Sequence, residues 1–462
     1  MTASVSAVDS PFEIEKIARW CASAGPFSDL ALERATHAFT DTIGCIIAGA
    51  SDQATIAARK AFMPGLDTGT SAVVGAARMP PAQAALINAV AAHALDYDDN
   101  YHGATTHASA VQVPALLAVA QSYGKSGLEL LEAYIVGLEA QAWVSSGVNP
   151  SHYTAGWHAT STIGTIGTAA GVARLLGLDE TGIAHALSIA ISMASGVKGQ
   201  FGTPTKPLHA GLAARNAVEA AQLSASGMRG CLDVLESLQG FKSLYGGNYP
   251  KGWDGAWPAA YGEGLAIERF GLTTKRHPCC GATHRGIDAV LDLRAEHGFG
   301  AEDVEKIEIV VTQAHARNLS YTRPENEMQA RFSMQYAVAL ALFQGELKLS
   351  DFTQQGVERP NIRALLALTE ISSYDDDTER NATGRLPHRI SIRLKDGRRF
   401  VDIRDKAKGD AAMPFSDEER KLKFIDCLDF SGLHIKEPEA LFRLSNAIAT
   451  LDAAALLQFD MR

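Results

Sequence analysis

The segment Thr160-Ser-Thr-Ile-Gly-Thr-Ile-Gly-Thr-Ala-Ala-Gly-Val-Ala-Arg-Leu-Leu-Gly177 carries apolar residues at helical spacing with small residues between them. Gly164, Gly167 and Gly171 interrupt this pattern and lower its helix propensity. Such glycines are tolerated where another helix approaches closely, so we expect packing in a bundle rather than contact with a ligand. The same helical periodicity extends from Pro11 to about residue 230 without a strand of useful length, which predicts an all-α region.

Helix start signals support this prediction. Ser28 precedes an apolar run that continues to Ala50, and Ser126 precedes the run from Gly127 to Val144. A serine hydroxyl at these positions can accept a hydrogen bond from a first-turn backbone N–H.

The periodicity changes after about residue 270. The segments 304–311 and 389–394 alternate polar and apolar residues, and Lys395-Asp-Gly397 predicts a hairpin turn to a return strand that ends at Ile403. Helical patterns at 283–297 and 332–343 lie next to these strands in the sequence. This region is therefore predicted to be a small α+β domain.

Helices resume near the C-terminus. Ser416-Asp-Glu-Glu419 is a capping box, and the segment 437–457 has an amphipathic helical pattern, so we expect these helices to pack against the first helical region. The predicted fold is mainly α. An all-α domain comprises residues 1–268 and 405–462, and residues 269–404 form an α+β lid domain inserted before the C-terminal helices.

Composition excludes several classes of protein. The chain has 462 residues, 46% of them hydrophobic and 20% charged, which is typical of a globular protein. Its net charge of −10, without a run of Lys and Arg, argues against a nucleic-acid partner. Six scattered cysteines predict no disulfide framework, and Met1–Ser10 lacks the features of a signal peptide. No apolar stretch is long enough to span a membrane, so we expect a cytoplasmic protein without a membrane partner.

The histidines gather in one quarter of the chain, and the densest segment is His93-Ala-Leu-Asp-Tyr-Asp-Asp-Asn-Tyr-His-Gly-Ala-Thr-Thr-His107. It places Asp96, Asp98 and Asp99 beside histidines where a helix is expected to end. Three hypotheses fit this pattern: an acid/base site, carboxylates that cap helix ends, and a metal site. The spacing matches no HExxH or calcium-loop pattern, so an acid/base site is favoured over a metal site.

Two further segments combine chemistry-bearing residues with expected helix starts. Gly156-Trp-His-Ala-Thr-Ser161 puts His158 before a helix whose N-terminal amides favour anions. Gly199-Gln-Phe-Gly-Thr-Pro-Thr-Lys-Pro-Leu-His209 carries Lys206 into the next helix. This lysine could clamp a carboxylate, transfer a proton, form a Schiff base with pyridoxal phosphate, or simply face solvent.

Cations also cluster in Lys275-Arg-His-Pro-Cys-Cys-Gly-Ala-Thr-His284, at the expected entry to the α+β domain. In an acidic protein, these cations together with Lys206 and His209 predict a small anionic ligand in a cleft between the domains. Cys279 and Cys280 are poorly placed as a zinc pair and are expected to be buried structural residues. No GxGxxG motif is present, and Gly124-Lys-Ser126 lacks the first glycine of a P-loop.

These segments together resemble the MmgE/PrpD family over almost the whole chain. The resemblance rests on Ala92-His-Ala-Leu-Asp-Tyr-Asp-Asp99, on Gly156 to Gly167, on Thr205-Lys-Pro-Leu-His209 and on Lys275 to His284. It implies a homodimer with the active site between an all-α domain and a lid. It also implies an enzyme without metal or organic cofactor that removes a proton next to a carboxylate in a small di- or tricarboxylic acid.

The resemblance further implies roles for individual residues. The implied catalytic residues are Asp96, His107, His158, Lys206 and, more weakly, Tyr321. The implied substrate-binding residues are Asn100, His102, His209, Lys275, Cys280, His284 and Tyr336, the last as an alternative alignment of the Tyr321 role.

Departures from the family pattern leave the reaction open. Asn100 stands where the decarboxylases carry threonine, Cys280 stands where they carry histidine, and the segment from His102 to His107 is longer by one residue. These differences argue against itaconate formation and favour an epimerase of an iminodisuccinate-like acid, whereas lyases are the better known members. We therefore predict a dehydratase or decarboxylase, with an epimerase and a non-catalytic carboxylate-binding protein as alternatives.

Overall fold

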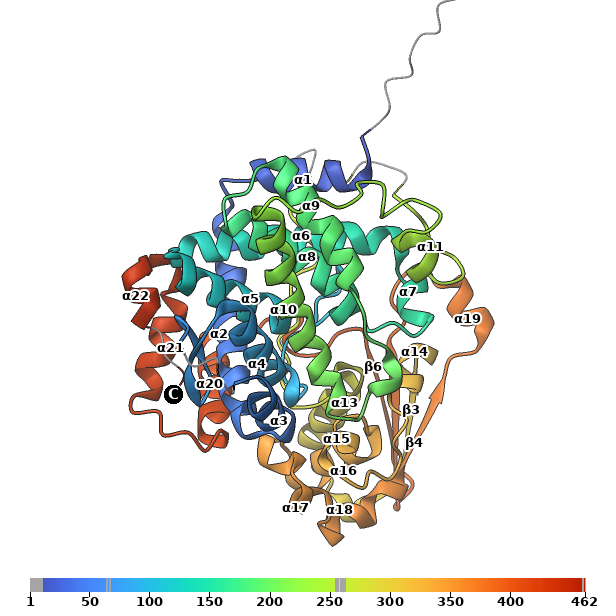
Figure 1. Ribbon diagram of the computed structural model, residues 1–462. Coiled ribbons are helices and arrows are strands. Elements are labelled where there is room, and N and C mark those ends of the chain that lie inside the picture. Colours follow the sequence, from blue (N-terminus) through green and yellow to red (C-terminus); the bar gives the residue numbers. More distant parts are fainter. Residues whose placement is uncertain are drawn as a thin grey trace, which may run out of the picture.

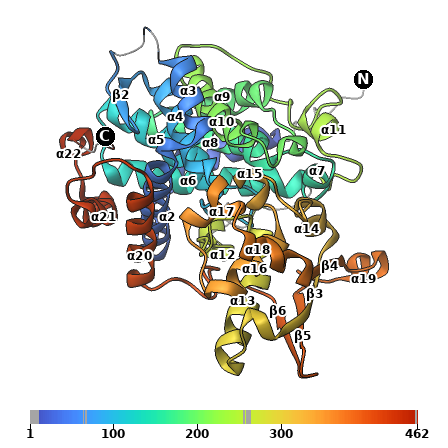
Figure 2. The same cartoon turned by 90° about the horizontal axis from the view of Figure 1, so that it is seen from below.

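A computed structural model describes residues 11–63, 65, 68–253, 257, 263–458 and 461 (Figure 1). The segment Met1–Ser10, which was predicted not to be a signal peptide, lies outside the described residues. Helices make up one part of the molecule, and the four-stranded sheet with its helices forms the other, as the perpendicular view also shows (Figure 2).

A bundle of long helices forms the centre of the all-α part. Its members are α4 (Pro81–Ala94), α5 (Ala108–Tyr123), α6 (Gly127–Val148), α8 (Ala159–Leu175), α9 (Glu180–Met193) and α10 (Thr205–Ala225). Helix α10 packs against α4 and α8, and α6 packs against α8. Several of these helices are apolar on all sides, because neighbours surround them completely.

The glycines of α8 allow its close approach to α6. A Cβ atom at Gly167 would lie 2.3 Å from Cγ of Gln141, and one at Gly171 would lie 2.7 Å from the carbonyl oxygen of Ala133. At Gly164 the nearest neighbour, a methyl group of Val111, would be at an ordinary 3.6 Å. The predicted packing role is confirmed for Gly167 and Gly171.

The predicted helix starts are also confirmed, and one strand pair was missed. The hydroxyl of Ser28 accepts a hydrogen bond from Ala31 N at the start of α2 (Asp29–Ala48), and Ser126 forms a capping box with Glu129 at the start of α6. The prediction of an exclusively helical first region was wrong at β1 (Ser71–Val73) and β2 (Ala76–Met79), an antiparallel pair. These strands are too short to show an alternating pattern.

The remaining N-terminal helices and the short helices complete the layout. They are α1 (Glu13–Ser23), α3 (Gln53–Phe62), α7 (Ser151–Thr154), α11 (Phe241–Tyr245), α12 (Ala266–Arg269), α14 (Gln313–Asn318), α15 (Glu327–Ala330), α17 (Gln354–Val357), α18 (Pro360–Leu365) and α19 (Asp376–Asn381).

The lid contains a sheet with the strand order β4-β3-β5-β6, formed by β3 (Val304–Val311), β4 (Thr369–Ser373), β5 (His388–Leu394) and β6 (Arg399–Arg404). The strand β3 pairs in parallel with β4 and antiparallel with β5. Helices α13 (Gly281–His297) and α16 (Met334–Gln344) pack against the sheet. The predicted strands and helices are confirmed, whereas β4 was not predicted because it is short and lacks a clear alternation.

The C-terminal helices return to the bundle, as predicted. Helix α20 (Asp417–Phe430) packs against α2 and buries Phe424 and Cys427. The single amphipathic helix predicted at 437–457 was wrong, because the structure has α21 (Pro438–Asn446) and α22 (Ala453–Gln458). Between them the chain becomes extended at Leu451, whose carbonyl accepts a hydrogen bond from Gly127 N.

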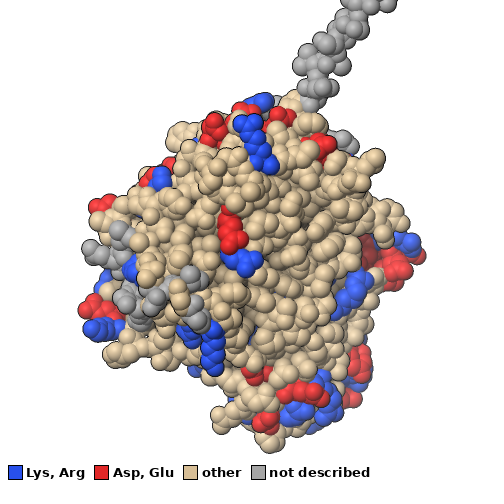
Figure 3. All heavy atoms as spheres, in the orientation of Figure 1, with Lys and Arg blue, Asp and Glu red and all other residues tan. Residues whose placement is uncertain are grey.

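Two large hydrophobic clusters support the proposed division into domains. One extends from Ile14 to Ile267 and includes side chains of α20, while the other extends from Cys279 to Leu394. We retain residues 269–404 as the proposed lid. None of the helices in the described part of the chain combines the length and the apolar character that a membrane span requires. On the face shown in Figure 3, basic and acidic side chains are interspersed and form no continuous basic surface.

Candidate active site

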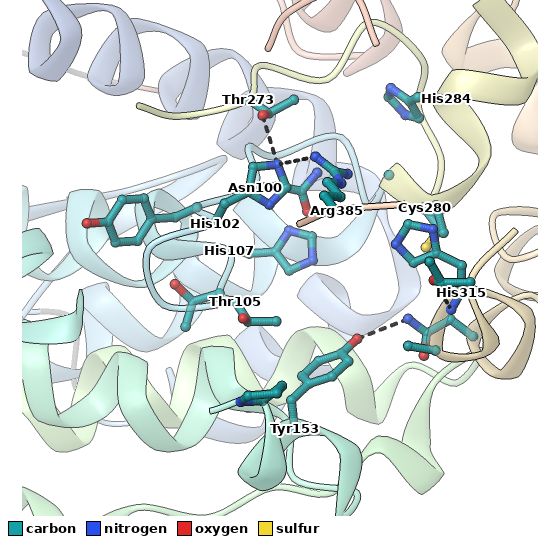
Figure 4. Close-up of a pocket in the computed structure, with 18 of the residues that line it drawn as sticks. Asn100, His102, Thr105, His107, Tyr153, Thr273, Cys280, His284, His315 and Arg385 are labelled. Carbon is teal, nitrogen blue, oxygen red and sulfur yellow. Dashed lines mark hydrogen bonds between the residues drawn. The ribbon is translucent and has the colours of Figure 1, made fainter. Parts of the chain in front are cut away.

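A cavity of about 590 Å³ lies between the bundle and the lid (Figure 4). The bundle side contributes Asp96, Asn100, His102, His107, His158 and Lys206 to its lining, and the lid contributes Cys280, His284, Arg285, His315 and Arg385. The entry to the lid is tied to the bundle by two backbone hydrogen bonds between Asn100 and Thr273, of 3.0 and 2.8 Å. A Cβ atom at Gly281 would lie 2.6 Å from Nδ2 of Asn100, so the start of α13 needs a glycine here.

Four helices begin at this cavity without a capping side chain. His107, His158 and Cys280 are the N-cap residues of α5, α8 and α13, and α10 begins one residue before Lys206. In none of these four helices does the N-cap side chain accept a hydrogen bond from a first-turn amide, in contrast to α2 and α6. Asp99 accepts from Ser109 N in α5 and Thr203 accepts from Thr205 N in α10, and these leave the other first-turn amides available. The N-termini of helices carry partial positive charge and favour anions. The cavity is therefore suited to a ligand with several negative charges.

Two buried lysines converge on one buried aspartate at the base of the site. Lys206 Nζ is hydrogen bonded to Asp96 Oδ1, and Lys275 Nζ lies 3.1 Å from Oδ2 and 2.6 Å from the carbonyl oxygen of Asp96. Burial alone would raise the pKa of this carboxyl group, but the two ammonium groups hold the pKa of Asp96 well below its usual range. The cluster has one more positive than negative charge, so it can accept a further carboxylate.

Backbone strain occurs at the same place. Asp96 has φ +52° and Thr105, which also lines the cavity, has φ +58°. They are the only non-glycine residues with positive φ in the described part of the chain. A left-handed conformation is unfavourable for a β-branched residue such as threonine, and strain of this kind concentrates at functional sites.

Histidines line the cavity beside the lysine cluster. His107 donates from Nδ1 to the carbonyl oxygen of Asp99 at 2.9 Å, which leaves Nε2 as the free nitrogen of its neutral ring. His158 Nδ1 lies 3.1 Å from His209 Nδ1, while His158 Nε2 is buried without a hydrogen-bond partner. Burial lowers the pKa of both His107 and His158, the latter well below its usual range. Both rings can exchange a proton with a bound ligand.

A third histidine and an aspartate support this pair from behind. His93 Nδ1 lies 2.7 Å from Asp98 Oδ2, and His107 Nδ1 lies 3.3 Å from the same oxygen. Together with Asp96, these groups have potential metal-ligand atoms within 4.8 Å of one another. A divalent ion there would be repelled by the ammonium groups of Lys206 and Lys275, which already neutralise Asp96. The absence of a metal site remains a prediction.

The structure brings most of the predicted site residues together. Asp96, Asn100, His102, His107, His158, Lys206, Cys280 and His284 all line the cavity. His209 and Lys275 do not line it, but they contact His158 and Asp96, respectively. We therefore assign these two residues a positioning role rather than a direct substrate contact.

The two predicted tyrosines lie elsewhere. Tyr321 donates a hydrogen bond to the carbonyl oxygen of Phe201, a residue of the lining, at 3.2 Å. Tyr336 is buried in the lid core, where its hydroxyl donates to the carbonyl oxygen of Asp351 at 2.6 Å. The assignment of Tyr336 to substrate binding does not agree with this position, because its hydroxyl is already used inside the lid.

Several lining residues were not singled out in the sequence. Arg285 directly follows the recognised segment that ends at His284, and its charge was the available signal. His315 and Arg385 lie in lid segments without a distinctive pattern, so only the tertiary structure places them here. Tyr153 also lines the cavity, and its hydroxyl accepts a hydrogen bond from Asn318 Nδ2 at 3.0 Å.

Comparisons with known proteins agree with the fold. Residues 15–253 match the MmgE/PrpD N-terminal domain, and residues 277–439 match the MmgE/PrpD C-terminal domain. The chain is 31% identical over 411 residues to a cis-aconitate decarboxylase from Homo sapiens, covering 87% of this chain and 84% of that protein. It is 32% identical over 358 residues to the Mus musculus protein of the same name (75% and 72% covered) and 26% identical over 406 residues to one from Aspergillus terreus (82% and 81% covered).

These relatives confirm the predicted lyase class, and the two matched domains cover both the bundle and the lid. The order of the four sequence segments, the helical bundle and the cavity between bundle and lid all agree with these matches. The chain belongs to the MmgE/PrpD family.

Proposed function

We propose that the protein decarboxylates a small tricarboxylic acid of the cis-aconitate type. The observation that carries this proposal is the cavity itself, at which four helices begin without a cap from their N-cap side chains and which contains the buried pair of Asp96 and Lys206, with Lys275 against it. The relatives named as cis-aconitate decarboxylases support the same substrate class. No organic or metal cofactor is part of the proposal.

The reaction requires one bond to break and one proton to be added. The bond from the CH2 group to its carboxylate breaks and releases carbon dioxide, and the electron pair forms a new terminal double bond. The electrons of the original double bond move to the carbon beside a retained carboxylate and produce enolate-like charge there. A proton added to that carbon completes the product, methylenesuccinate.

The positive groups of the cavity stabilise the charge that develops in the transition state. Lys206 and the amides at the start of α13 are placed to hold the retained carboxylate, where the enolate-like charge collects. The ion pair with Asp96 holds Lys206 in place, which favours an electrostatic role for Lys206 over a Schiff base.

The proton comes from one of the two cavity histidines in this proposal. His107 and His158 both line the cavity, and each has a free Nε2 in the arrangement described above. Their low pKa keeps them neutral in the empty site, and a bound polyanion raises the pKa of each ring by its negative charge. Substrate binding thereby protonates the acid that the reaction needs.

We predict that Lys206→Met lowers kcat for cis-aconitate by at least about 10²-fold, because a preorganised cation is lost from the transition state. The measurement is proton NMR in D2O, which follows the vinyl signals of methylenesuccinate. Lys60→Met, at an exposed position of α3, is the matched control and keeps full activity. Full activity in Lys206→Met would contradict the proposed role.

An epimerase is the second candidate, and Cys280 is the observation that favours it. The thiol lies in the cavity at the N-cap of α13, where the family resemblance places histidine in decarboxylases. The same NMR experiment separates the two candidates. Exchange of an α-proton in an iminodisuccinate-type acid without vinyl signals indicates an epimerase, and vinyl signals from cis-aconitate indicate the decarboxylase.

We also propose a homodimer, as the family resemblance implies. Light scattering coupled to size-exclusion chromatography measures the molar mass directly. A mass near that of one 49.1 kDa chain would contradict this proposal.

A further inference from the structure

The lid end of the cavity contains two arginines, the buried Arg285 and the exposed Arg385, that form no ion pair with a carboxylate among the described residues. Arg285 is 1% exposed, and its Nη1 atom donates only to the carbonyl oxygens of Leu386, Arg404 and Asp405 at 2.9 to 3.5 Å. Its Nε atom is buried without a partner. Neither Arg285 nor Arg385 forms a salt bridge with any carboxylate among the described residues.

A buried and unpaired guanidinium is costly, because it loses hydration without gaining a counter-ion. Asp405 and Asp410 act on Arg285, and Asp410 acts on Arg385, only through longer-range charge, without an ion pair. Arg285 Nη2 donates to His315 Nδ1 at 3.4 Å, and Arg385 Nη1 donates to His102 Nε2 at 3.3 Å. Burial and then the nearby charge of Arg385 lower the pKa of Arg285. Two like charges face the same space, and an anion between them would stabilise both.

The remaining polar groups of this end are consistent with an anionic occupant. His102 Nε2 accepts hydrogen bonds from both Arg385 and Thr273, and Figure 4 shows both side chains pointing toward this ring. His284 lines the same space, and its Nδ1 atom is buried without a hydrogen-bond partner. A ligand atom can therefore engage Arg285, Arg385 and His284 without displacing an ion pair.

Two carboxylates also line this part of the cavity, and both are already engaged. Asp410 lies 3.5 Å from the ammonium group of Lys406 and accepts from Ala412 N at 3.0 Å. Glu379 accepts a hydrogen bond from Gln313 N at 2.5 Å. Neither carboxylate forms an ion pair with Arg285 or Arg385.

The size of the cavity leaves room for a second carboxylate position. A volume of about 590 Å³ lies in the range that proteins use for ligands larger than a single carboxylate group. Arg285 lies five residues after Cys280, so at a helical rise of 1.5 Å per residue its Cα is about 7.5 Å further along α13. The two residues therefore mark separate positions along the same helix.

We propose that Arg285 and Arg385, with His102 and His284, form a second carboxylate subsite that binds the distal carboxylate of the substrate. This inference rests on the proposed function for the class of substrate. The catalytic end then holds the carboxylate next to the reacting carbon, and the lid end selects tricarboxylic over shorter dicarboxylic acids.

The test is isothermal titration calorimetry with tricarballylate and malonate. Tricarballylate has no double bond and does not react, so its affinity is measured independently of any turnover. Because one charge-assisted contact is lost, we expect Arg385→Gln to weaken tricarballylate binding about tenfold or more. Malonate is too short to reach both ends, and its Kd is expected to change less than twofold. Arg389→Gln, at an exposed position of β5, is the matched control and changes neither Kd.

Arg385 is the better variant because Arg285 also holds three lid carbonyl groups, and its replacement could unfold the lid. Unchanged tricarballylate affinity in Arg385→Gln, or an equal loss for both acids, would overturn the subsite. The subsite would also be overturned if two small anions, malonate and sulfate, bound simultaneously and independently while tricarballylate bound no more tightly than malonate. If the reaction proves to be another one but the selective loss is observed, the subsite stands and only the proposed function fails.

Discussion

Asp96 combines strain, burial and charge at one position. Its backbone has positive φ, and its side chain is 3% exposed between the ammonium groups of Lys206 and Lys275. Two lysines would be too costly to bury here without this carboxylate. Asp96 therefore has a structural role in addition to its position in the active site.

We predict that Asp96→Asn lowers the free energy of unfolding by about 3–5 kcal/mol, because it leaves two buried ammonium groups without a counter-ion. Urea denaturation near neutral pH measures this loss. Asp377→Asn provides the control, since the Asp377 side chain is 84% exposed and its ion pair with Arg380 is worth little. A loss below about 1 kcal/mol in Asp96→Asn would show that the cluster relaxes or hydrates.

The contribution of Asp96 also depends on pH in a defined direction. Because the folded-state pKa is held below the unfolded value of about 3.9, the stabilisation is complete above that value and is lost as pH falls toward the folded pKa. The difference in stability between the wild type and Asp96→Asn should therefore shrink below about pH 4. Denaturation curves in acid check this, and a constant difference would contradict it.

At the scale of elements, the N-termini of helices and the contacts between helices contribute to the site in different ways. Helices α2 and α6 begin with a side-chain cap, at Ser28 and Ser126, while the N-cap side chains of the four helices that begin at the cavity form no such hydrogen bond. The contact between α6 and α8 helps to hold one element of the candidate site in place, because His158 is the N-cap residue of α8.

We predict that Gly167→Ala destabilises the protein by about 1–3 kcal/mol, since the added methyl group would overlap Gln141 and force α6 and α8 apart. Gly164→Ala is a matched control in the same helix, where the methyl group has space. It should be neutral or stabilise by up to about 1 kcal/mol through helix propensity. Thermal and urea denaturation of both variants measure the contrast, and equal effects would contradict the packing argument.

At the scale of the whole molecule, many histidines are buried in the neutral form. Burial lowers the pKa of His93 and His284 to about 3 and that of His152 to about 4, against about 6.5 in an unfolded chain. At pH values between the folded-state pKa of each histidine and its unfolded-state pKa of about 6.5, the unfolded chain binds more protons than the folded protein. Stability is therefore complete above about pH 6.5 and falls as the pH decreases toward 4.

We predict that His152→Gln reduces the slope of unfolding free energy against pH by up to about 1.4 kcal/mol per pH unit between about pH 6 and 4. His152 is fully buried outside the lining of the cavity. Its Nδ1 donates to the carbonyl oxygen of Tyr245, and Nε2 of the neutral ring accepts from the hydroxyl of Thr162. The replacement lowers stability at neutral pH, but only the slope tests the titration. The control is His434→Gln at an exposed position, and an unchanged slope in His152→Gln would contradict the prediction.

Much of the architecture could be predicted because it depends on local patterns. The glycines of α8, the caps of α2 and α6 and the alternation in β3 and β5 each carry their own physical signal. The break between α21 and α22 depends instead on a backbone contact between Leu451 and Gly127, which are far apart in the chain. Short elements such as β4 are formed by their partner strand rather than by their own sequence.

The candidate site also has features that local sequence patterns predict and features that they do not. The sequence by itself determined the family, the fold class and the residue types of the catalytic cluster, because those residues lie in compact segments with recognisable order. Only the tertiary structure decided that Lys275 contacts Asp96 rather than the cavity, that Tyr336 belongs to the lid core, and that Arg385 joins the cavity. The physical reason is that charge pairing and burial depend on distance in space, which local sequence patterns do not encode.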